Sequence, residues 1–224
     1  MRVKEMRQEV TKTLADFASS VRFSDLPEEA LRHSKKCILD LLGVALAGSM
    51  TIPGRIIIDF VKKLGGEPEA TVISSPLMVP CTNAALANGT LAHALELDDG
   101  SRYAMGHPGV VVIPAALAAA ESNDVSGKDL ITAVVLGYET FIRLGSAVNP
   151  SHFRRGFHTT GTCGTFAAAV AAGKILGLDE DGMANALGLA GTQSAGLFEF
   201  VSDGSMSKPL HPGRSAQSGV LAVL

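Results

Sequence analysis

The stretch Ala167-Ala-Ala-Val-Ala-Ala-Gly173 decides the fold class of this chain. Alanine has the highest helix propensity of the amino acids, and small side chains allow neighbouring helix axes to approach closely. Similar alanine-rich blocks occupy residues 84–94 and 115–120, whereas only 5% of all residues are aromatic and none is tryptophan. The sequence therefore predicts a bundle-like domain of closely packed, Ala- and Gly-rich helices.

Apolar residues at three- and four-residue steps predict further helices on both sides of this stretch. The segment 24–29 is a helix start, because a capping residue and an early proline precede acidic residues. The expected helices span residues 14–21, 24–48, 53–64, 82–95, 109–121, 127–147, 161–176, 180–195 and 213–224. Residues 70–73 are the one expected strand, so the predicted fold is all-α with one minor strand.

Glycines inside the predicted helices also indicate close packing. A glycine within a helix costs up to about 1 kcal/mol relative to alanine, so a close neighbour is expected to explain each one. The positions concerned are Gly89, Gly137, Gly173 and Gly188.

Composition excludes several classes of protein. The 224 residues suit one large or two small domains, and 46% hydrophobic against 18% charged residues excludes disorder as the main state. With 19 basic and 22 acidic residues, the chain has no overall field for nucleic acid or an anionic membrane. Three widely spaced cysteines suggest neither disulfides nor structural zinc. No clean apolar run spans a membrane, and the N-terminus is too charged for a secretory signal. We expect a cytoplasmic protein without membrane or nucleic-acid partners.

The first of three polar loops lies between His93 and Gly109. Three carboxylates, Glu96, Asp98 and Asp99, follow an alanine-rich helix, and a His-Pro-Gly step introduces the next one. An isolated Asp-Asp-Gly is most often a solvated turn. The two histidines, His93 and His107, and Arg102 around it favour a functional site.

Two further loops each lead into a helix. In residues 154–165, His158 precedes a Gly/Thr-rich turn that includes Thr160, and the following helix N-terminus is a natural anion site. In residues 205–215, Lys208 and Arg214 flank another helix start. Each feature alone has an ordinary structural explanation, either helix capping or a solvated cation.

Together the loops offer histidines, carboxylates, cations and helix N-termini, which match a small polycarboxylate substrate. Removing a proton next to a carboxylate needs a base that titrates near the working pH and fixed positive charge for the enediolate. His107 and His158 are the acid/base candidates. Lys208 and Arg214 would neutralise substrate carboxylates. A metal held by His93, Glu96 and His107 is an alternative, because helical spacing places residues 93 and 96 on one face.

The chain resembles the MmgE/PrpD family. The similarity rests on four ordered motifs and runs from the first helix to the last residue: His93-Ala-Leu-Glu-Leu-Asp-Asp99, His107-Pro-Gly109, Gly156-Phe-His-Thr-Thr-Gly-Thr162 and Lys208-Pro-Leu-His-Pro-Gly-Arg214. The family includes 2-methylcitrate dehydratase, cis-aconitate decarboxylase and iminodisuccinate epimerase. The resemblance implies a helical domain joined to a smaller α+β domain, a homodimer, and a site without metal or organic cofactor.

The resemblance also implies roles for particular residues. The resemblance gives catalytic roles to His107, His158, Asp98 and Asp99, and substrate-binding roles to Lys208 and Glu96. The loop residues themselves add Arg102, Arg214 and Thr160 to the expected substrate-binding set. Further family residues, including a lysine and a tyrosine, would lie beyond residue 224. The family commonly has Asp-Phe-Asp-Asp-Thr where this chain has Glu96-Leu-Asp-Asp-Gly100. The spacing from this segment to His107 is also about one residue longer than in the decarboxylase branch of the family. These departures disfavour a decarboxylase and do not identify 2-methylcitrate as the substrate.

The expected activity is that of a cofactor-free hydro-lyase like 2-methylcitrate dehydratase. An epimerase of the same family, a metal-dependent enzyme and a non-catalytic interaction module are the alternatives. Residues 215–224 form an apolar helix without a polar cap or glycine stop, so the chain is expected to be the N-terminal part of a protein about twice as long. Some of its apolar residues would then face the remainder or a dimer partner, and the fragment alone would be inactive and prone to association.

Overall fold

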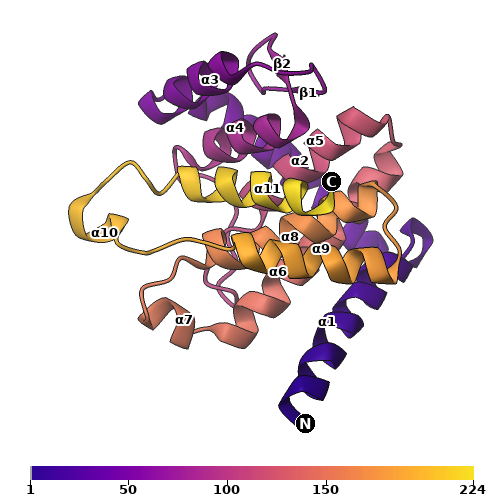
Figure 1. The fold of residues 1–224 in the computed structure, drawn as a ribbon. Helices are drawn as coiled ribbons and strands as arrows, with labels where there is room; N and C mark the ends of the chain where they lie inside the picture. Colours follow the sequence, from indigo (N-terminus) through magenta and orange to yellow (C-terminus); the bar gives the residue numbers. More distant parts are fainter. Residues whose placement is uncertain (1) are drawn as a thin grey trace.

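The computed structural model describes residues 2–224, with side chains from Val10 onward. This part of the chain is almost entirely helical (Figure 1). Its elements are α1 (Arg2–Ser20), the 3₁₀ helix η1 (Phe23–Asp25), α2 (Glu28–Gly48), α3 (Ile52–Leu64), β1 (Ala70–Thr71), β2 (Met78–Val79), α4 (Cys81–His93), α5 (Gly109–Asn123), α6 (Gly127–Val148), α7 (Ser151–Arg154), α8 (Thr159–Ile175), α9 (Glu180–Gln193), α10 (Phe200–Asp203) and α11 (Leu210–Val223).

Helix α8 lies at the centre of the fold and contains the alanine-rich stretch 167–173. Helices α5, α6, α9 and α11 pack around it, and nearly all of its residues are buried. Figure 1 shows α11 crossing in front of α8. A helix with small or apolar side chains on every face can be surrounded by neighbours rather than bury one stripe. The predicted all-α fold is confirmed.

Glycines allow the closest helix contacts. A Cβ on Gly213 of α11 would lie 2.3 Å from the Leu86 carbonyl oxygen of α4, and one on Gly137 would lie 2.4 Å from a Val112 methyl. Gly89 and Gly173 also have close neighbours, so the packing explanation holds there. It is wrong for Gly188, where a Cβ would have nothing within 4 Å.

The expected single strand at residues 70–73 is a two-stranded hairpin. Ala70 and Thr71 pair antiparallel with Val79 and Met78, a partner strand that the sequence analysis missed. Residues 72 and 73 leave the ladder, and the Ile73 amide donates to the side chain of Asn88 on α4. Strands of two residues are too short to show alternation of apolar and polar residues.

Several helix boundaries also differ from the expectation. Residues 24 and 25 belong to η1, where Asp25 accepts a hydrogen bond from the Arg22 amide at 2.8 Å, and α2 begins at Glu28. Helices α8 and α11 begin at Thr159 and Leu210, two and three residues earlier than predicted. The four-residue helices α7 and α10 were missed because they span barely one turn.

By length and composition alone, α6 could cross a membrane. Helices α2 and α3, which are bent by 91° where they meet, could also do so if together they formed one broken span. The sequence analysis expected no such segment. Helix α6 packs against α8 and α5 and buries residues such as Phe141 in the core. Core helices commonly meet the same criteria, so this finding is weak evidence for a membrane span.

Candidate functional site

The C-terminal end of α4 and the N-terminal ends of α5, α8 and α11 meet at one place. His93 is the last residue of α4, and His107 lies two residues before α5. His158 caps α8, and His211 is the second residue of α11. Free amides give a helix N-terminus a partial positive charge. The fold therefore gathers four imidazoles and three positive helix ends.

The loop between α4 and α5 folds back on itself and fixes His107. Ser101 and Gly106 exchange backbone hydrogen bonds of 2.8 and 3.3 Å. Gly106 lies so close to α6 and α8 that a Cβ would be 2.9 Å from the Phe141 ring. The His107 amide then donates to the Thr160 hydroxyl at 3.1 Å. The start of α8 thus anchors the His107 loop.

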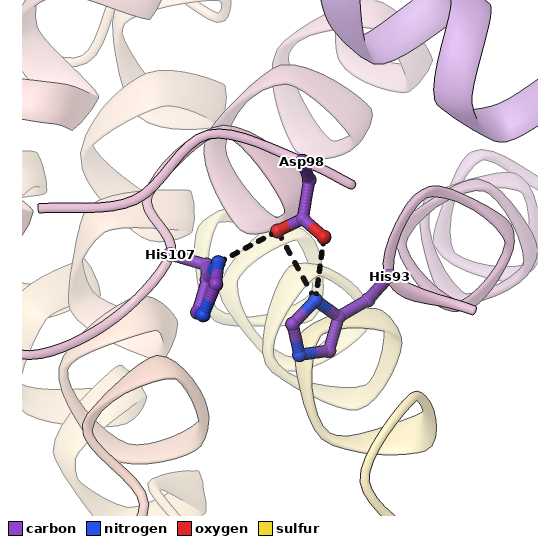
Figure 2. Close-up of side chains that lie close together, drawn as sticks. All are labelled: His93, Asp98 and His107. Carbon is purple, nitrogen blue, oxygen red and sulfur yellow. Dashed lines mark hydrogen bonds and ion pairs between the residues drawn. The ribbon is translucent and has the colours of Figure 1, made fainter. Parts of the chain in front are cut away.

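Asp98 joins two of the histidines (Figure 2). Its Oδ1 lies 2.9 Å from Nδ1 of His93, and its Oδ2 lies 2.9 Å from Nδ1 of His107. The Asp98 side chain is 2% exposed. The two imidazole rings meet edge to face, with their centroids 4.8 Å apart.

These contacts assign the tautomers of both rings. Nδ1 of His107 faces two acceptors, the Asp98 carboxylate and the Asp99 carbonyl oxygen 3.0 Å away, so this nitrogen carries the proton. Nε2 of neutral His107 is then a free base. Nδ1 of His93 donates to Asp98 in the same way, and Nε2 of His93 is buried without a hydrogen-bond partner among the described residues.

Electrostatics make Asp98 a permanent anion. Burial raises its pKa, but hydrogen bonds with His107 and His93 outweigh burial and hold the pKa at about 2. Burial lowers the pKa of His107, but its hydrogen bond and ion pair with Asp98 outweigh this, so the pKa is raised. Asp98 therefore stabilises the imidazolium that forms when His107 accepts a proton.

Asp99 has a different position from its neighbour. Its carboxylate accepts hydrogen bonds from the Gly109 amide at 3.1 Å and from the Tyr138 hydroxyl at 2.9 Å. Burial raises its pKa, and these two bonds offset that only in part. The side chain therefore anchors the first residue of α5, and only its backbone carbonyl contacts a histidine.

His158 has a neutral imidazole as its partner. Its Nδ1 lies 2.9 Å from Nδ1 of His211, and the rings of Phe198 and Phe200 pack against it with centroids 5.8 and 5.1 Å away. Burial lowers its pKa to about 2, aided by His211, His93 and the charge of Lys208. His158 is therefore neutral at ordinary pH.

Lys208 and Glu96 form an ion pair at the edge of the histidine cluster. Their Nζ and Oε2 atoms are 2.5 Å apart, and their side chains are 18% and 52% exposed. Glu96 reaches this position from the left-handed backbone region, with φ at +53°. The ammonium group also lies 5.6 Å from the centroid of the Phe200 ring. The cation expected to bind a substrate carboxylate already binds a carboxylate of this chain.

The remaining candidate residues are Thr160, Arg102 and Arg214. Thr160 is fully buried, and its hydroxyl holds the His107 amide. Arg102 is exposed in the loop before α5. Arg214 is exposed and donates to Gln217, which bonds Asn83 near the start of α4, the end opposite His93.

The sequence analysis did not assign His211 to the site. It counted His93 in favour of a functional site but gave it no role except as an alternative metal ligand. It also missed Phe198 and Phe200. His93 and His211 lay within the motifs already quoted, which was the available signal. The two phenylalanines have no such signal, because they reach His158 through the bend of the chain around α10.

The group suited to a metal also differs from the expectation. His93, Asp98 and His107 have potential ligand atoms within 4.8 Å of one another. Glu96 is not in this group and is paired with Lys208 instead. In the structure Asp98 instead bonds Nδ1 of both histidines.

Comparison with known proteins agrees with the resemblance seen in the sequence motifs. Residues 12–224 match the family model of the MmgE/PrpD N-terminal domain. A cis-aconitate decarboxylase of Aspergillus terreus is 32% identical over 221 residues, which cover 96% of this chain and 45% of that protein. The human cis-aconitate decarboxylase is 31% identical over 97% of this chain and 46% of its own length. The chain spans about half the length of these relatives.

Proposed function

The chain belongs to the MmgE/PrpD family, and on that premise we propose that it is part of a cofactor-free lyase acting on a small di- or tricarboxylic acid. One observation carries the proposal: acid/base histidines and fixed positive charge lie together at three helix N-termini. A substrate with several carboxylates matches these positive groups. Removal of a proton from the carbon next to a carboxylate requires a base such as one of the histidines.

His107 is the proposed base that removes the proton next to a substrate carboxylate. Its Nε2 has the free electron pair, and Asp98 stabilises the imidazolium that forms when Nε2 takes the proton. The negative charge that develops on the enediolate would be met by Lys208 and the positive helix ends. A buried anion that orients and stabilises an imidazole is a recurrent arrangement in catalysis.

Lys208 is the proposed carboxylate-binding residue, with Glu96 as its partner in the free protein. Glu96 is half-exposed, so its carboxylate can leave the ammonium group when a substrate carboxylate arrives. The exchange keeps Lys208 paired throughout, and an isolated charge at a half-buried site is avoided.

Dehydration, as by 2-methylcitrate dehydratase, is the first reaction that we propose. A proton leaves the carbon next to the carboxylate, a neighbouring hydroxyl group leaves as water, and a carbon–carbon double bond forms. One histidine takes the first proton, and a second group supplies a proton to the departing hydroxyl.

Decarboxylation is the second candidate, because the relatives above are named cis-aconitate decarboxylases. It would also develop charge next to a carboxylate and end with protonation of that carbon. Epimerisation of a related acid would use the same proton transfer without breaking a carbon–oxygen or carbon–carbon bond.

The test uses the full-length protein that contains this chain, with 2-methylcitrate, citrate and cis-aconitate supplied separately. Dehydration predicts a new ultraviolet absorbance of a conjugated double bond without carbon dioxide. Decarboxylation predicts carbon dioxide release, and epimerisation predicts only deuterium uptake from heavy water and inversion. The proposal is wrong if none of the acids is converted or exchanges a proton.

Two controls separate the alternative functions. Treatment with a chelator should leave turnover unchanged, whereas a catalytic metal at His93, Asp98 and His107 predicts loss of activity and metal in elemental analysis. A non-catalytic interaction module predicts that citrate-like acids do not raise the melting temperature, because only a ligand of the native state stabilises it.

A further inference from the structure

His211 and His158 contact each other through the same atom of each ring. The two Nδ1 atoms are 2.9 Å apart, and the ring centroids are 5.2 Å apart. A hydrogen bond here requires a proton on one Nδ1 and a lone pair on the other. When both rings are neutral, they must therefore be opposite tautomers. The ring that accepts at Nδ1 carries its N–H at Nε2, and the ring that donates from Nδ1 has a lone pair on Nε2.

The surroundings keep both rings neutral. The Phe200 ring packs against both imidazoles, with centroids 5.1 Å from His158 and 5.6 Å from His211. The positive end of α8 begins at His158, and Lys208 lies close enough for its charge to disfavour a cation there. Burial lowers the pKa of His211 as it does that of His158. An imidazolium is thus strongly disfavoured at His158, and it is disfavoured at His211 as well.

His107 and His158 therefore differ in what they can do with a proton. The partner of His107 is a carboxylate, so His107 can become a cation and remain one. The partner of His158 is another imidazole, which offers no negative charge to balance a gained proton. A role for His158 in proton transfer needs a path by which a proton leaves as another arrives.

We infer that His211 is a positioning residue that completes such a path, so that His158 moves a proton without becoming a cation. A proton bonds to Nε2 of His158, the Nδ1 proton of His158 passes to Nδ1 of His211, and the Nε2 proton of His211 leaves to solvent. Two N–H bonds form and two break, and both rings stay neutral. His211 is partly exposed, which gives the outgoing proton a route. The inference rests on the proposed function and takes His158 as its second group, which supplies a proton to the departing hydroxyl by the same steps in reverse.

Nuclear magnetic resonance of the full-length protein with ¹⁵N-labelled histidine tests the pair without any substrate. The expected result is two neutral rings of opposite tautomer at pH 6, with a scalar coupling between the two Nδ1 atoms. A protonated His158 or His211 at pH 6, or identical tautomers, would overturn the inference.

Kinetics of His211→Asn test the relay. The asparagine amide can still hydrogen-bond Nδ1 of His158, but it cannot pass a proton on. We expect kcat to fall about 10²-fold, the lower range for loss of general acid–base catalysis, with KM little changed. His33→Asn, on the exposed face of α2, is the matched control and should keep wild-type kcat. Wild-type kcat in His211→Asn contradicts the inference.

Chemical rescue separates a relay from a merely structural role. Added imidazole should restore turnover to His211→Ala, because it offers both an acceptor and a transferable proton. Added 1-methylimidazole fills similar space and still offers an acceptor nitrogen, but it has no N–H to pass on and should not restore turnover; equal rescue by both compounds contradicts the relay. If wild-type protein converts none of the acids, the proposed function fails. The tautomers measured by magnetic resonance then test separately whether His158 and His211 form a neutral hydrogen-bonded pair.

Discussion

At the scale of single residues, Asp98 is the group on which two imidazoles depend. Substitution Asp98→Asn replaces two acceptor oxygens by one acceptor and one donor, so one of His93 and His107 must take the other tautomer. We expect kcat to fall by about 10²–10⁴-fold, the range for loss of positioned acid–base catalysis. Steady-state kinetics on the converted acid, with a check of folding by circular dichroism, measure this.

The neighbouring Asp99 supplies the comparison for that prediction. Its carboxylate bonds Gly109 and Tyr138 rather than an imidazole. Asp99→Asn should therefore lower the melting temperature more clearly than it lowers kcat. An equal loss of kcat in both variants would contradict the separate positions of the two carboxylates.

Lys208, which lies just before α11, and Arg214, which lies within it, are two cations with different expected effects. Lys208→Gln should raise KM about 10- to 100-fold, since one charge-assisted hydrogen bond contributes about 1.5–3 kcal/mol. Arg214→Gln should leave KM unchanged, because Arg214 bonds Gln217, which in turn bonds Asn83 near the start of α4. The measurement is KM for the same acid, and a KM effect confined to Arg214 would reverse the assignment.

At the scale of elements, the contact between α4 and α11 sets the position of His211. A Cβ on Gly213 would lie 2.2 Å from the Thr90 hydroxyl and 2.3 Å from a backbone oxygen, so Gly213→Ala must push the helices apart. We expect it to lower the free energy of unfolding by about 1–3 kcal/mol, as for other overpacked cores. Chemical denaturation measures the change.

Gly188 in α9 is the matched control for this substitution. A Cβ there meets nothing within 4 Å. Gly188→Ala should therefore raise the free energy of unfolding by up to about 1 kcal/mol through helix propensity. Destabilisation of both variants by the same amount would mean that helix packing is not the cause.

Helix α3 presents a row of exposed apolar side chains along one face. The members are spaced four residues apart: Ile52, Ile56, Phe60 and Leu64, each 49–65% exposed. We expect this row to contact a second copy of the protein, in line with the homodimer that the resemblance implies. Phe60→Glu should weaken self-association in sedimentation experiments, whereas Glu28→Gln should not; an unchanged mass distribution would contradict the prediction.

At the scale of the whole molecule, buried neutral histidines couple stability to pH. The pKa of His158 is about 2 in the folded protein, against about 6.5 in an unfolded chain. Between these values the unfolded chain binds a proton that the folded protein does not, so stability rises with pH and is lost on acidification. His158 can contribute at most about 1.4 kcal/mol per pH unit to the slope of the unfolding free energy against pH.

Substitution His158→Asn removes this contribution. The unfolding free energy, measured between pH 4.5 and 6, should depend less steeply on pH than in the wild type. His33→Asn should keep the wild-type slope. An unchanged slope in His158→Asn would show that His158 is protonated in the folded protein.

The class of fold and most of the helices follow from the amino-acid sequence alone. Alanine and glycine blocks specify helices with little regard to distant residues, and their small side chains already imply burial and close contact. Gly188 shows the limit, since a glycine in a helix looks the same in sequence whether its Cβ would clash or face open space. The pairs of residues that form β1–β2 and the single turns of α7 and α10 are too short to give a periodic signal.

Most candidate site residues could also be found in the sequence, because their types and motifs mark possible chemistry. Their hydrogen-bond partners follow from the folded structure and not from the sequence. Asp98 and Asp99 are adjacent and identical, yet one bonds two imidazoles and the other bonds Gly109 and Tyr138. His158 meets His211 across 53 residues because α8 and α11 pack together. Hydrogen-bond partners depend on positions within a few tenths of an ångström, and only the packing of whole helices fixes positions so closely.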